Sequence, residues 1–124
     1  MELSDLEKYK LYDAEFKFCS LIWDSEPINS TELVKLCHSK LGWKKSTTYT
    51  VLRKLCERGI LKNENAMVSA IVKREDAQRY ESTSVVDKAF DGSLPQFLAS
   101  FFGGRKISEK EAEELKRIIE EAAK

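Results

Sequence analysis

The first part of the chain alternates apolar and polar residues with the period of an α-helix. One face of residues 5–23 is apolar, and its members are Leu11, Ala14, Phe18, Leu21, Ile22 and Trp23. This pattern predicts a first helix over those residues. The helix should end within the sequence DSEP, because Pro27 disfavours the helical conformation in the residue before it.

A second helix is predicted from residue 29 or 30 to residue 41. Asn29 or Ser30 can accept a hydrogen bond from the exposed backbone amides at its start, and Glu32 follows Asn29 at the spacing of a capping box. Gly42 supplies the left-handed residue that commonly ends a helix. The predicted buried stripe of this helix consists of Leu33, Leu36, Cys37 and Leu41.

A third helix follows at once in the sequence GWKKSTTYTVLRKLCERGILK, residues 42–62. Ser46 is its predicted N-cap, and Gly59 is the residue expected to close it. The spacing i, i+3, i+4, i+7 predicts an inward face formed by Thr48, Val51, Leu52 and Leu55.

After Gly59 the pattern changes to that of short strands. Residues 60–63 and 67–72 are extended runs around the turn-forming residues Asn63, Glu64 and Asn65. Two tightly linked helices followed by a hairpin predict a winged helix-turn-helix. In that arrangement the second helix of the pair enters the major groove of DNA.

The last third of the chain predicts three more amphipathic helices, over residues 73–90, 95–102 and 108–124, the last of them with a Ser108–Glu111 capping box. Within one copy their apolar residues have little to pack against and would leave an exposed patch. We therefore expect them to pair with a second copy, and the alternative is that they cover the winged helix. The predicted dimerisation residues are Val86, Phe90, Leu94, Phe97, Leu98, Phe101, Phe102, Leu115, Ile118 and Ile119.

The predicted fold class is thus mainly α with a small β-hairpin wing. Residues 1–73 are expected to form a winged helix-turn-helix DNA-binding domain, and residues 74–124 a C-terminal helical dimerisation subdomain. A length of 124 residues suits one small domain with an appended subdomain.

Charge is concentrated in one segment of a chain whose formal net charge is zero. Residues 36–62 carry seven basic residues and one acidic residue, a net charge of +6, whereas residues 1–35 carry four and eight, a net charge of −4. A single basic segment is typical of a localised contact with a polyanion. A charged run by itself, however, is more often a solvated helix face.

The position of these charges on the third helix favours a contact with nucleic acid. Its outward face is basic and rich in hydroxyl groups, which donate hydrogen bonds to phosphate oxygens and base edges. The predicted DNA-binding residues are Lys44, Lys45, Ser46, Thr47, Tyr49, Thr50, Arg53, Lys54 and Arg58. The alternative is a winged-helix module whose basic helix docks an acidic protein.

Little in the sequence supports a metal site, a cofactor or catalysis. The three cysteines, Cys19, Cys37 and Cys56, lie in apolar stripes without a CxxC pair, which predicts reduced and buried thiols. His38 stands beside Cys37, but no further ligands follow at the spacing of a zinc site. The chain also shows no carboxylate pair and no glycine-rich phosphate loop, so we expect no enzyme.

The sequence also predicts a cytoplasmic protein that does not insert into a membrane. No apolar run approaches the roughly 18 to 20 residues that a membrane span needs. The start, MELSDLEKYK, is too charged for a signal peptide.

Five segments carry a resemblance to a known family, and they occur in this order from about Leu11 to Ile119: DAEFKFCSLIW, TELVKLC, GWKKSTTYTVLRKLCERGIL, FDGSLPQFLASFF and ISEKEAEELKRII. In order and spacing they resemble the BlaI/MecI/CopY (penicillinase repressor) family of bacterial transcriptional regulators. The resemblance implies a homodimeric winged-helix repressor that binds double-stranded, palindromic operator DNA and dimerises through its C-terminal helices. It also implies that Thr47, Thr50 and Lys54 face the DNA.

The chain departs from the family pattern at several positions. Members that are cleaved in a circuit with a receptor protease typically have Asn-Phe at the scissile position, where this chain has Ser100-Phe101, and this argues against such a partner. Copper-responsive members carry a C-terminal cysteine cluster, but no cysteine follows Cys56. The usual Lys-Thr pair of the recognition helix reads Ser46-Thr47, so the operator preference is expected to differ.

Overall fold

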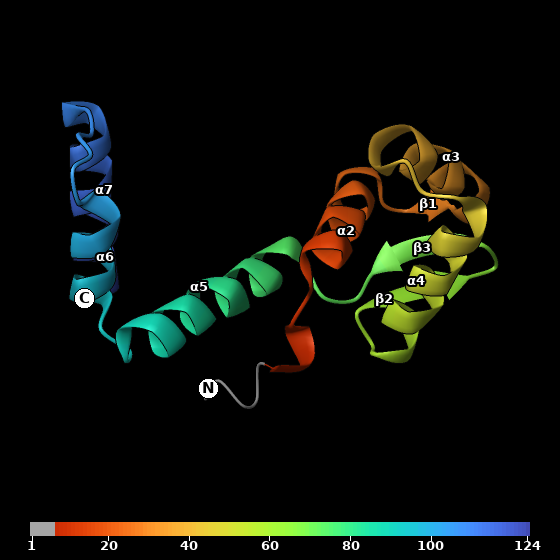
Figure 1. Ribbon diagram of the computed structural model, residues 1–124, viewed down its shortest axis with the longest axis horizontal. Helices are drawn as coiled ribbons and strands as arrows, with labels where there is room; N and C mark the ends of the chain where they lie inside the picture. Colours follow the sequence, from red (N-terminus) through yellow and green to blue (C-terminus); the bar gives the residue numbers. More distant parts are fainter. Residues whose placement is uncertain (1–6) are drawn as a thin grey trace. The chain divides into compact units, whose positions relative to one another are not determined.

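The computed structural model describes residues 7–124, and the chain divides into two compact units. The first unit ends at Val85, and the second spans Val86–Lys124 (Figure 1). The elements in chain order are η1 (Glu7–Tyr9), α2 (Asp13–Ser25), β1 (Ile28–Asn29), α3 (Ser30–Leu41), α4 (Lys45–Glu57), β2 (Leu61–Glu64), β3 (Met67–Ala70), α5 (Arg74–Phe90), α6 (Leu94–Phe102) and α7 (Glu109–Ala122). The predicted fold class, mainly α with a small β-hairpin wing, is confirmed.

Helix α2 begins later than the sequence pattern predicted. The predicted start at Asp5 lies outside the described residues, and η1 occupies residues 7–9 before α2 begins at Asp13. The backbone N–H of Tyr12 donates a hydrogen bond to the Glu15 carboxylate at 2.9 Å, which satisfies an otherwise unpaired group at the helix start. The expectation that Ala14 is buried is wrong, because the face that packs inward is formed by Glu15, Phe18, Cys19 and Ile22.

Helix α3 begins and ends as the sequence predicted. Of the two candidate caps, Asn29 is the one used, since its side chain accepts from the Thr31 backbone N–H at 2.8 Å. At the other end Gly42 has a φ of +69°, and its N–H donates to the His38 carbonyl at 3.1 Å. Leu33 and Cys37 are fully buried, whereas the other two residues of the predicted stripe are half-buried.

Helix α4 starts before Ser46, so the prediction of Ser46 as N-cap is wrong. Lys44 has extended backbone angles and precedes the first helical residue, and its carbonyl accepts from both the N–H and the hydroxyl of Thr48. Gly59 ends the helix as predicted. Its N–H donates to the Cys56 carbonyl and that of Ile60 to the Leu55 carbonyl, which is the pattern of a Schellman motif.

The sheet is small and antiparallel, with the strand order β1-β3-β2. Strands β2 and β3 form the predicted hairpin and pair from Leu61 with Ala70 to Glu64 with Met67. Strand β2 is shifted by one residue from the predicted run, and β3 ends two residues earlier than predicted. The prediction of Asn63 and Glu64 as turn residues is wrong, because both pair with β3. Asn65 and Ala66 form its tight turn and both have positive φ angles, 53° and 65°. Strand β1 was not predicted, because its two residues are too short to produce an alternating pattern.

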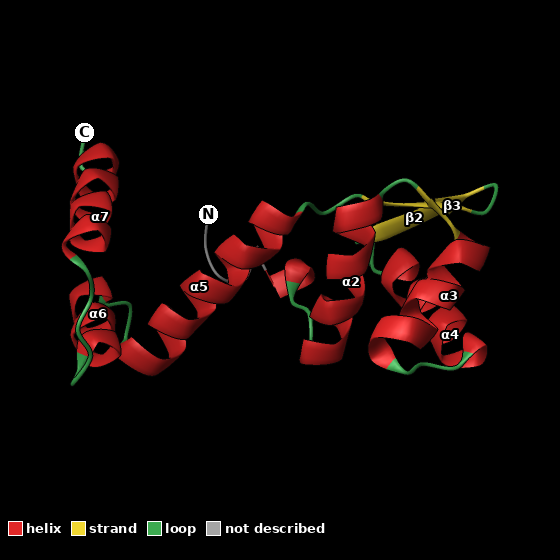
Figure 2. Cartoon of the chain, turned by 90° about the horizontal axis from the view of Figure 1, so that it is seen from above, coloured by secondary structure: helices red, strands yellow, loops and turns green. Residues whose placement is uncertain are grey.

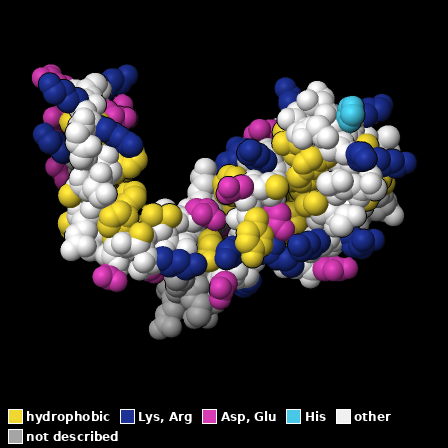
Figure 3. Space-filling view, viewed as in Figure 1, with side chains coloured by type: hydrophobic (Ala, Val, Ile, Leu, Met, Phe, Trp, Pro, Cys, Tyr) yellow, Lys and Arg dark blue, Asp and Glu magenta, His cyan; other side chains and the backbone are white. Residues whose placement is uncertain are grey.

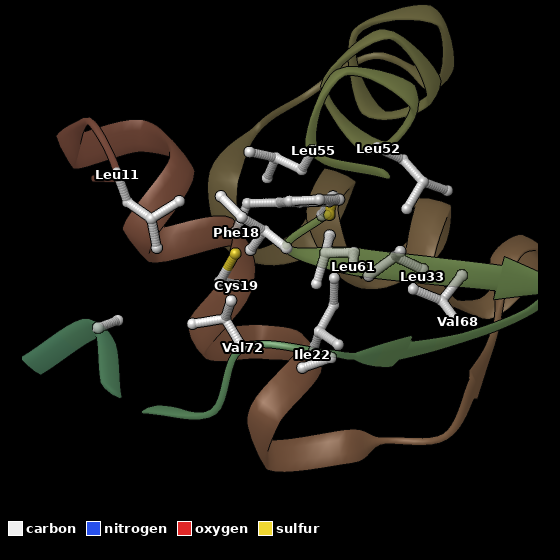
Figure 4. Packing of buried hydrophobic residues seen from close by; sticks show 14 residues of the cluster. Leu11, Phe18, Cys19, Ile22, Leu33, Leu52, Leu55, Leu61, Val68 and Val72 are labelled. Atoms are coloured by element: carbon white, nitrogen blue, oxygen red, sulfur yellow. The ribbon is translucent and has the colours of Figure 1, made fainter. Parts of the chain in front are cut away.

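The core of the first unit lies between α2, α3, α4 and the hairpin, which runs along one side of these helices (Figure 2). Phe18 and Ile22 of α2, Leu55 of α4 and Val68 of β3 all have exposed fractions of zero and belong to this core, in which Val68 lies beside Leu33 (Figure 4). Trp43 covers this core from the turn before α4, where its ring stacks on Phe18 with the centroids 5.4 Å apart. The turn between α3 and α4 is therefore anchored to the core through Trp43.

Helices α6 and α7 belong to the second unit, and neither contains a buried residue. Helix α6 starts at Leu94, with the Ser93 side chain accepting from the Gln96 N–H. Helix α7 starts after Ser108, whose side chain accepts from the Glu111 N–H, which is one of the two hydrogen bonds of the predicted capping box. The boundary of the compact units falls inside α5, and the division into functional domains after residue 73 stays a prediction.

Among residues 7–124, no helix is both long and apolar enough to traverse a lipid bilayer.

Candidate nucleic-acid interface

The free face of α4 carries a line of polar side chains. Thr48, Leu52 and Leu55 face the core, so the residues on the opposite side of the helix are turned outward. Ser46, Thr50 and Arg53 follow one another at i, i+4 and i+7 on that side, and all three are exposed. The free face therefore presents two hydroxyl groups and one guanidinium group side by side. These groups can donate hydrogen bonds to an acceptor-rich partner.

Exposed side chains on either side of the line extend this surface. Thr47 and Lys54 are exposed on the same helix, and Lys44 and Lys45 are exposed at its start. We call the seven residues of this surface the α4 face, and they are Lys44, Lys45, Ser46, Thr47, Thr50, Arg53 and Lys54.

The four cations of the α4 face make no ion pair with any other described residue. The ion pairs among residues 7–124 involve different lysines and arginines. Lys44 and Lys45 also stand at the N-terminus of α4, where the helix dipole is positive and acidic residues are preferred, yet the first turn contains no acid. Positive potential therefore accumulates at this end of the helix and is available to an anion.

Arg58 is separated from the α4 face by its contacts. Its guanidinium group lies 3.3 Å from the Glu15 carboxylate and also donates to the carbonyl of Lys10, and its side chain is only 30% exposed. Glu15 is 7% exposed, so this ion pair is partly shielded from water. Arg58 thus joins the end of α4 to the start of α2. The structure does not bring it together with the other predicted DNA-binding residues.

Tyr49 stands at the margin of the surface. It is half-buried and packs against the core, and its hydroxyl donates to Ser30 Oγ at 3.5 Å. The hydroxyl is therefore directed toward the start of α3. Tyr49 lies at the edge of the α4 face, where it could contact only a ligand that extends beyond that face.

Trp43 is a residue whose role the sequence reasoning missed. Its backbone N–H donates to the Cys37 carbonyl at 3.3 Å, and its ring stacks on Phe18, so both its backbone and its side chain are fixed. Lys44 and Lys45 follow directly after it. The sequence does contain a signal for this role. A tryptophan between a helix-ending glycine and a lysine pair indicates a turn that is anchored to the core.

The wing is polar but nearly neutral. Lys62 on β2 lies 3.9 Å from the carboxylate of Glu64, and both side chains are exposed. Asn63 and Asn65 are exposed near the turn. Amide groups can donate to phosphate oxygens, but this hairpin adds little positive charge to the surface.

The cysteines are unsuited to metal binding or nucleophilic chemistry. Burial raises the pKa of the Cys19 thiol to about 12 and the pKa of the Cys37 thiol to about 11, the latter despite a hydrogen bond with Thr48 that lowers it. Burial also raises the pKa of Cys56. These thiols are protonated at neutral pH. No group of three histidine, cysteine or carboxylate side chains within the described part of the chain could hold a metal ion.

The predicted dimerisation residues are incompletely covered in the single chain. Phe101 is 52% exposed and Ile118 is 64% exposed, and apolar side chains are visible on the surface of the second unit (Figure 3). Phe90, Phe97, Phe101 and Phe102 contact one another in series, with centroids 5.5 to 6.1 Å apart. Each of the remaining predicted residues is either half-buried or exposed, and they are Val86, Leu94, Leu98, Leu115 and Ile119.

Comparison with known proteins gives consistent matches over nearly the whole chain. Residues 11–121 match the family described as penicillinase repressor. The penicillinase repressor of Bacillus licheniformis is 25% identical over 116 residues, which cover 90% of this chain and 91% of the relative.

Two further similarities cover comparable lengths. The methicillin resistance regulatory protein MecI of Staphylococcus aureus is 21% identical over 119 residues, covering 93% of this chain and 97% of the relative. Among solved structures, a MarR family protein of Mycobacterium tuberculosis aligns with a TM-score of 0.47 and 22% identity, over 98% of this chain and 82% of that chain.

Proposed function

The chain belongs to the penicillinase repressor family of transcriptional repressors, and from this premise we propose that two copies of it bind a palindromic operator and occlude a promoter. The observation that carries this proposal is the α4 face. On the second helix of a helix-turn-helix it combines three hydroxyl side chains with four cations that pair with no acid among residues 7–124. An ordinary solvated helix face would mix acidic and basic residues in i, i+4 pairs, and this one does not.

The cations and the hydroxyl groups have different roles in this proposal. Lys44, Lys45, Arg53 and Lys54 neutralise phosphates, which sets affinity and register on the duplex but carries no sequence information. Ser46, Thr47 and Thr50 approach base edges in the major groove, with Tyr49 at the margin. Arg58 contributes by holding α4 against α2 and not by touching DNA.

The homodimer is proposed from the exposed apolar residues of the second unit. A single chain leaves the side chains of Leu94, Phe101, Ile118 and Ile119 more than half exposed, and burying them against a second copy would remove this surface from water. A two-fold dimer presents two α4 faces related by symmetry. The half-sites should then be separated by about one helical turn of DNA or a multiple of it.

Proteolytic induction is not part of the proposal. Ser100 and Phe101 lie inside α6, in regular helix, and differ from the Asn-Phe typical of relatives that are cleaved. A receptor protease would have to unfold the end of this helix to reach the backbone.

Selection of DNA from a random pool by the purified protein tests the proposed function. The expected result is a palindromic sequence that the protein binds with a steep salt dependence. With about four phosphate contacts per subunit, the logarithm of the binding constant should fall with the logarithm of salt concentration with a slope of about −7. No enrichment of a palindrome, or binding that is insensitive to salt, would contradict the proposal.

A further inference from the structure

The start of α5 is tied to the end of α2 by contacts that the DNA-binding proposal leaves unused. Arg74 Nη2 lies 2.6 Å from Asp24 Oδ1 and donates to the Ser20 carbonyl at 3.3 Å. The guanidinium carbon also lies 5.4 Å from the centroid of the Trp23 ring, as in a cation–π contact. Three groups of α2 therefore hold one guanidinium group.

Residues next to Arg74 are also tied to α2 and to the residue that follows it. Lys73 Nζ lies 3.6 Å from Glu26 Oε1, and the same carboxylate oxygen accepts from the Ala70 N–H at 3.0 Å. The indole N–H of Trp23 donates to the Val72 carbonyl at 3.0 Å. We call this cluster the α5 root, and it consists of Trp23, Asp24, Glu26, Lys73 and Arg74.

The charges of the α5 root are unfavourable for the helices on which they stand. Asp24 is in the last turn of α2, where the helix dipole disfavours an acid, and Arg74 is the first residue of α5, where the dipole disfavours a base. Each charge is offset by the other and not by its own helix. Because neither contributes to the stability of its helix, the pairing between the two elements accounts for their positions.

The direction of α5 has a direct geometric consequence for a dimer. Helix α5 has 17 residues and is about 25 Å long, so a change of about 10° at its root displaces its far end by about 4 Å. This displacement is close to the rise of about 3.4 Å per base pair along DNA. Since the proposed dimerisation residues all follow Val85, the direction of α5 affects how far apart a dimer holds its two α4 faces.

We propose that Arg74 is a positioning residue for operator recognition, and this inference rests on the proposed function. Ala77 and Tyr80 of α5 are buried and also hold this helix. By fixing the start of α5 on α2, Arg74 acts with them to set the direction in which α5 leaves the winged helix. It thereby restricts the separation of half-sites that the dimer accepts. Arg74 acts through α5 and does not touch DNA.

The test compares Arg74→Ala with the control Arg79→Ala, which removes an exposed arginine of the same helix. Affinity is measured for the palindrome selected from random DNA, for the same palindrome with one base pair inserted between the half-sites, and for a single half-site. The ratio of the first two affinities should fall about three- to tenfold in Arg74→Ala, because surface ion pairs and cation–π contacts are each of modest strength. The wild type and Arg79→Ala should have the same ratio of affinities for the selected and the lengthened palindrome. The affinity for a single half-site should be the same in all three proteins.

A second variant keeps the test decisive if Arg74→Ala folds poorly. Asp24→Asn removes the charge of an exposed partner without changing its shape, and it should lower the spacing ratio in the same direction. If a palindrome is selected but neither variant changes the ratio, this inference is wrong and the proposed function stands. If no palindrome is selected, the proposed function fails and this inference fails with it.

Discussion

At the scale of single residues, the structure distinguishes cations that form ion pairs from cations that do not, although the sequence predicted the same DNA contact for both kinds. Arg58 and Lys54 are four positions apart in a basic run, and both were predicted to contact DNA. Arg58 is occupied by Glu15 and a backbone carbonyl, whereas Lys54 makes no ion pair with another described residue. We therefore expect Arg58 to contribute to stability and Lys54 to contribute to DNA binding.

Replacing these two residues by alanine should affect different quantities. Arg58→Ala leaves the buried Glu15 carboxylate without its partner and should lower the free energy of unfolding by about 1 to 3 kcal/mol. Lys54→Ala should leave stability unchanged and reduce the magnitude of the salt slope by about one for each phosphate that the lysine neutralises. Urea denaturation and DNA titrations at several salt concentrations measure both. A stable Arg58→Ala protein with a reduced slope would place Arg58 on the DNA.

The buried cysteines give a pH dependence of stability whose sign follows from their raised pKa values. Burial raises the pKa of Cys19 from 9.0 to about 12, so the folded state keeps this thiol neutral over a range in which the unfolded chain ionises it. Its contribution is fully present below pH 9. It is lost progressively between pH 9 and 12, at no more than about 1.4 kcal/mol per pH unit.

Urea denaturation at pH 8, 9 and 10 checks this expectation, with Cys19→Ala as the control. The alanine variant should be less stable at pH 8 because it leaves a small cavity, but its stability should decline less between pH 9 and 10. Identical declines in the two proteins would show that Cys19 does not contribute.

At the scale of elements, α4 divides its surface between a core face and the α4 face, which we propose binds DNA, and Thr50 lies in the middle of the latter. Thr50→Val keeps the shape of the side chain and removes its hydroxyl group. We expect a loss of discrimination at one base pair, up to about 1 kcal/mol, with an unchanged salt slope, because a hydroxyl group reads bases and carries no charge.

Lys45→Ala is the complementary variant on the same helix. It should weaken binding to all sequences about equally and reduce the salt slope. Binding to a panel of operators with single base changes distinguishes the two effects. If Thr50→Val weakened all of them equally, Thr50 would have a positioning role and not a reading role.

At the scale of the whole molecule, the second unit is expected to complete its core with another copy of the chain. Phe101→Glu introduces a charge at an apolar position of α6 that is 52% exposed, and it should shift the protein from dimer to monomer in sedimentation at micromolar concentration. Ser100→Glu is the control, because the adjacent exposed side chain is polar. Operator affinity should fall with dimerisation, since the two half-site contacts would no longer be linked.

A monomeric wild-type protein at that concentration would contradict the proposed dimer. If Phe101→Glu remained a dimer like Ser100→Glu, α6 would not be at the interface.

Much of this protein follows from local sequence signals. The glycines that end α3 and α4, the Asn29 and Ser108 caps, the hairpin and the existence of the later helices were all predicted, because caps, glycine conformations and helical periods act over a few residues. The basic, hydroxyl-rich face of α4 was also visible, because the inward residues of a helix determine by periodicity which ones face out.

Only the tertiary structure decided which charged groups are free and which are engaged. The Arg58–Glu15 pair joins residues 43 positions apart, and the Arg74–Asp24 pair joins residues 50 positions apart. It also decided that Glu15 and not Ala14 is buried and that β1 pairs with β3. Such contacts depend on how distant segments pack, and no periodicity or capping signal in the sequence encodes them.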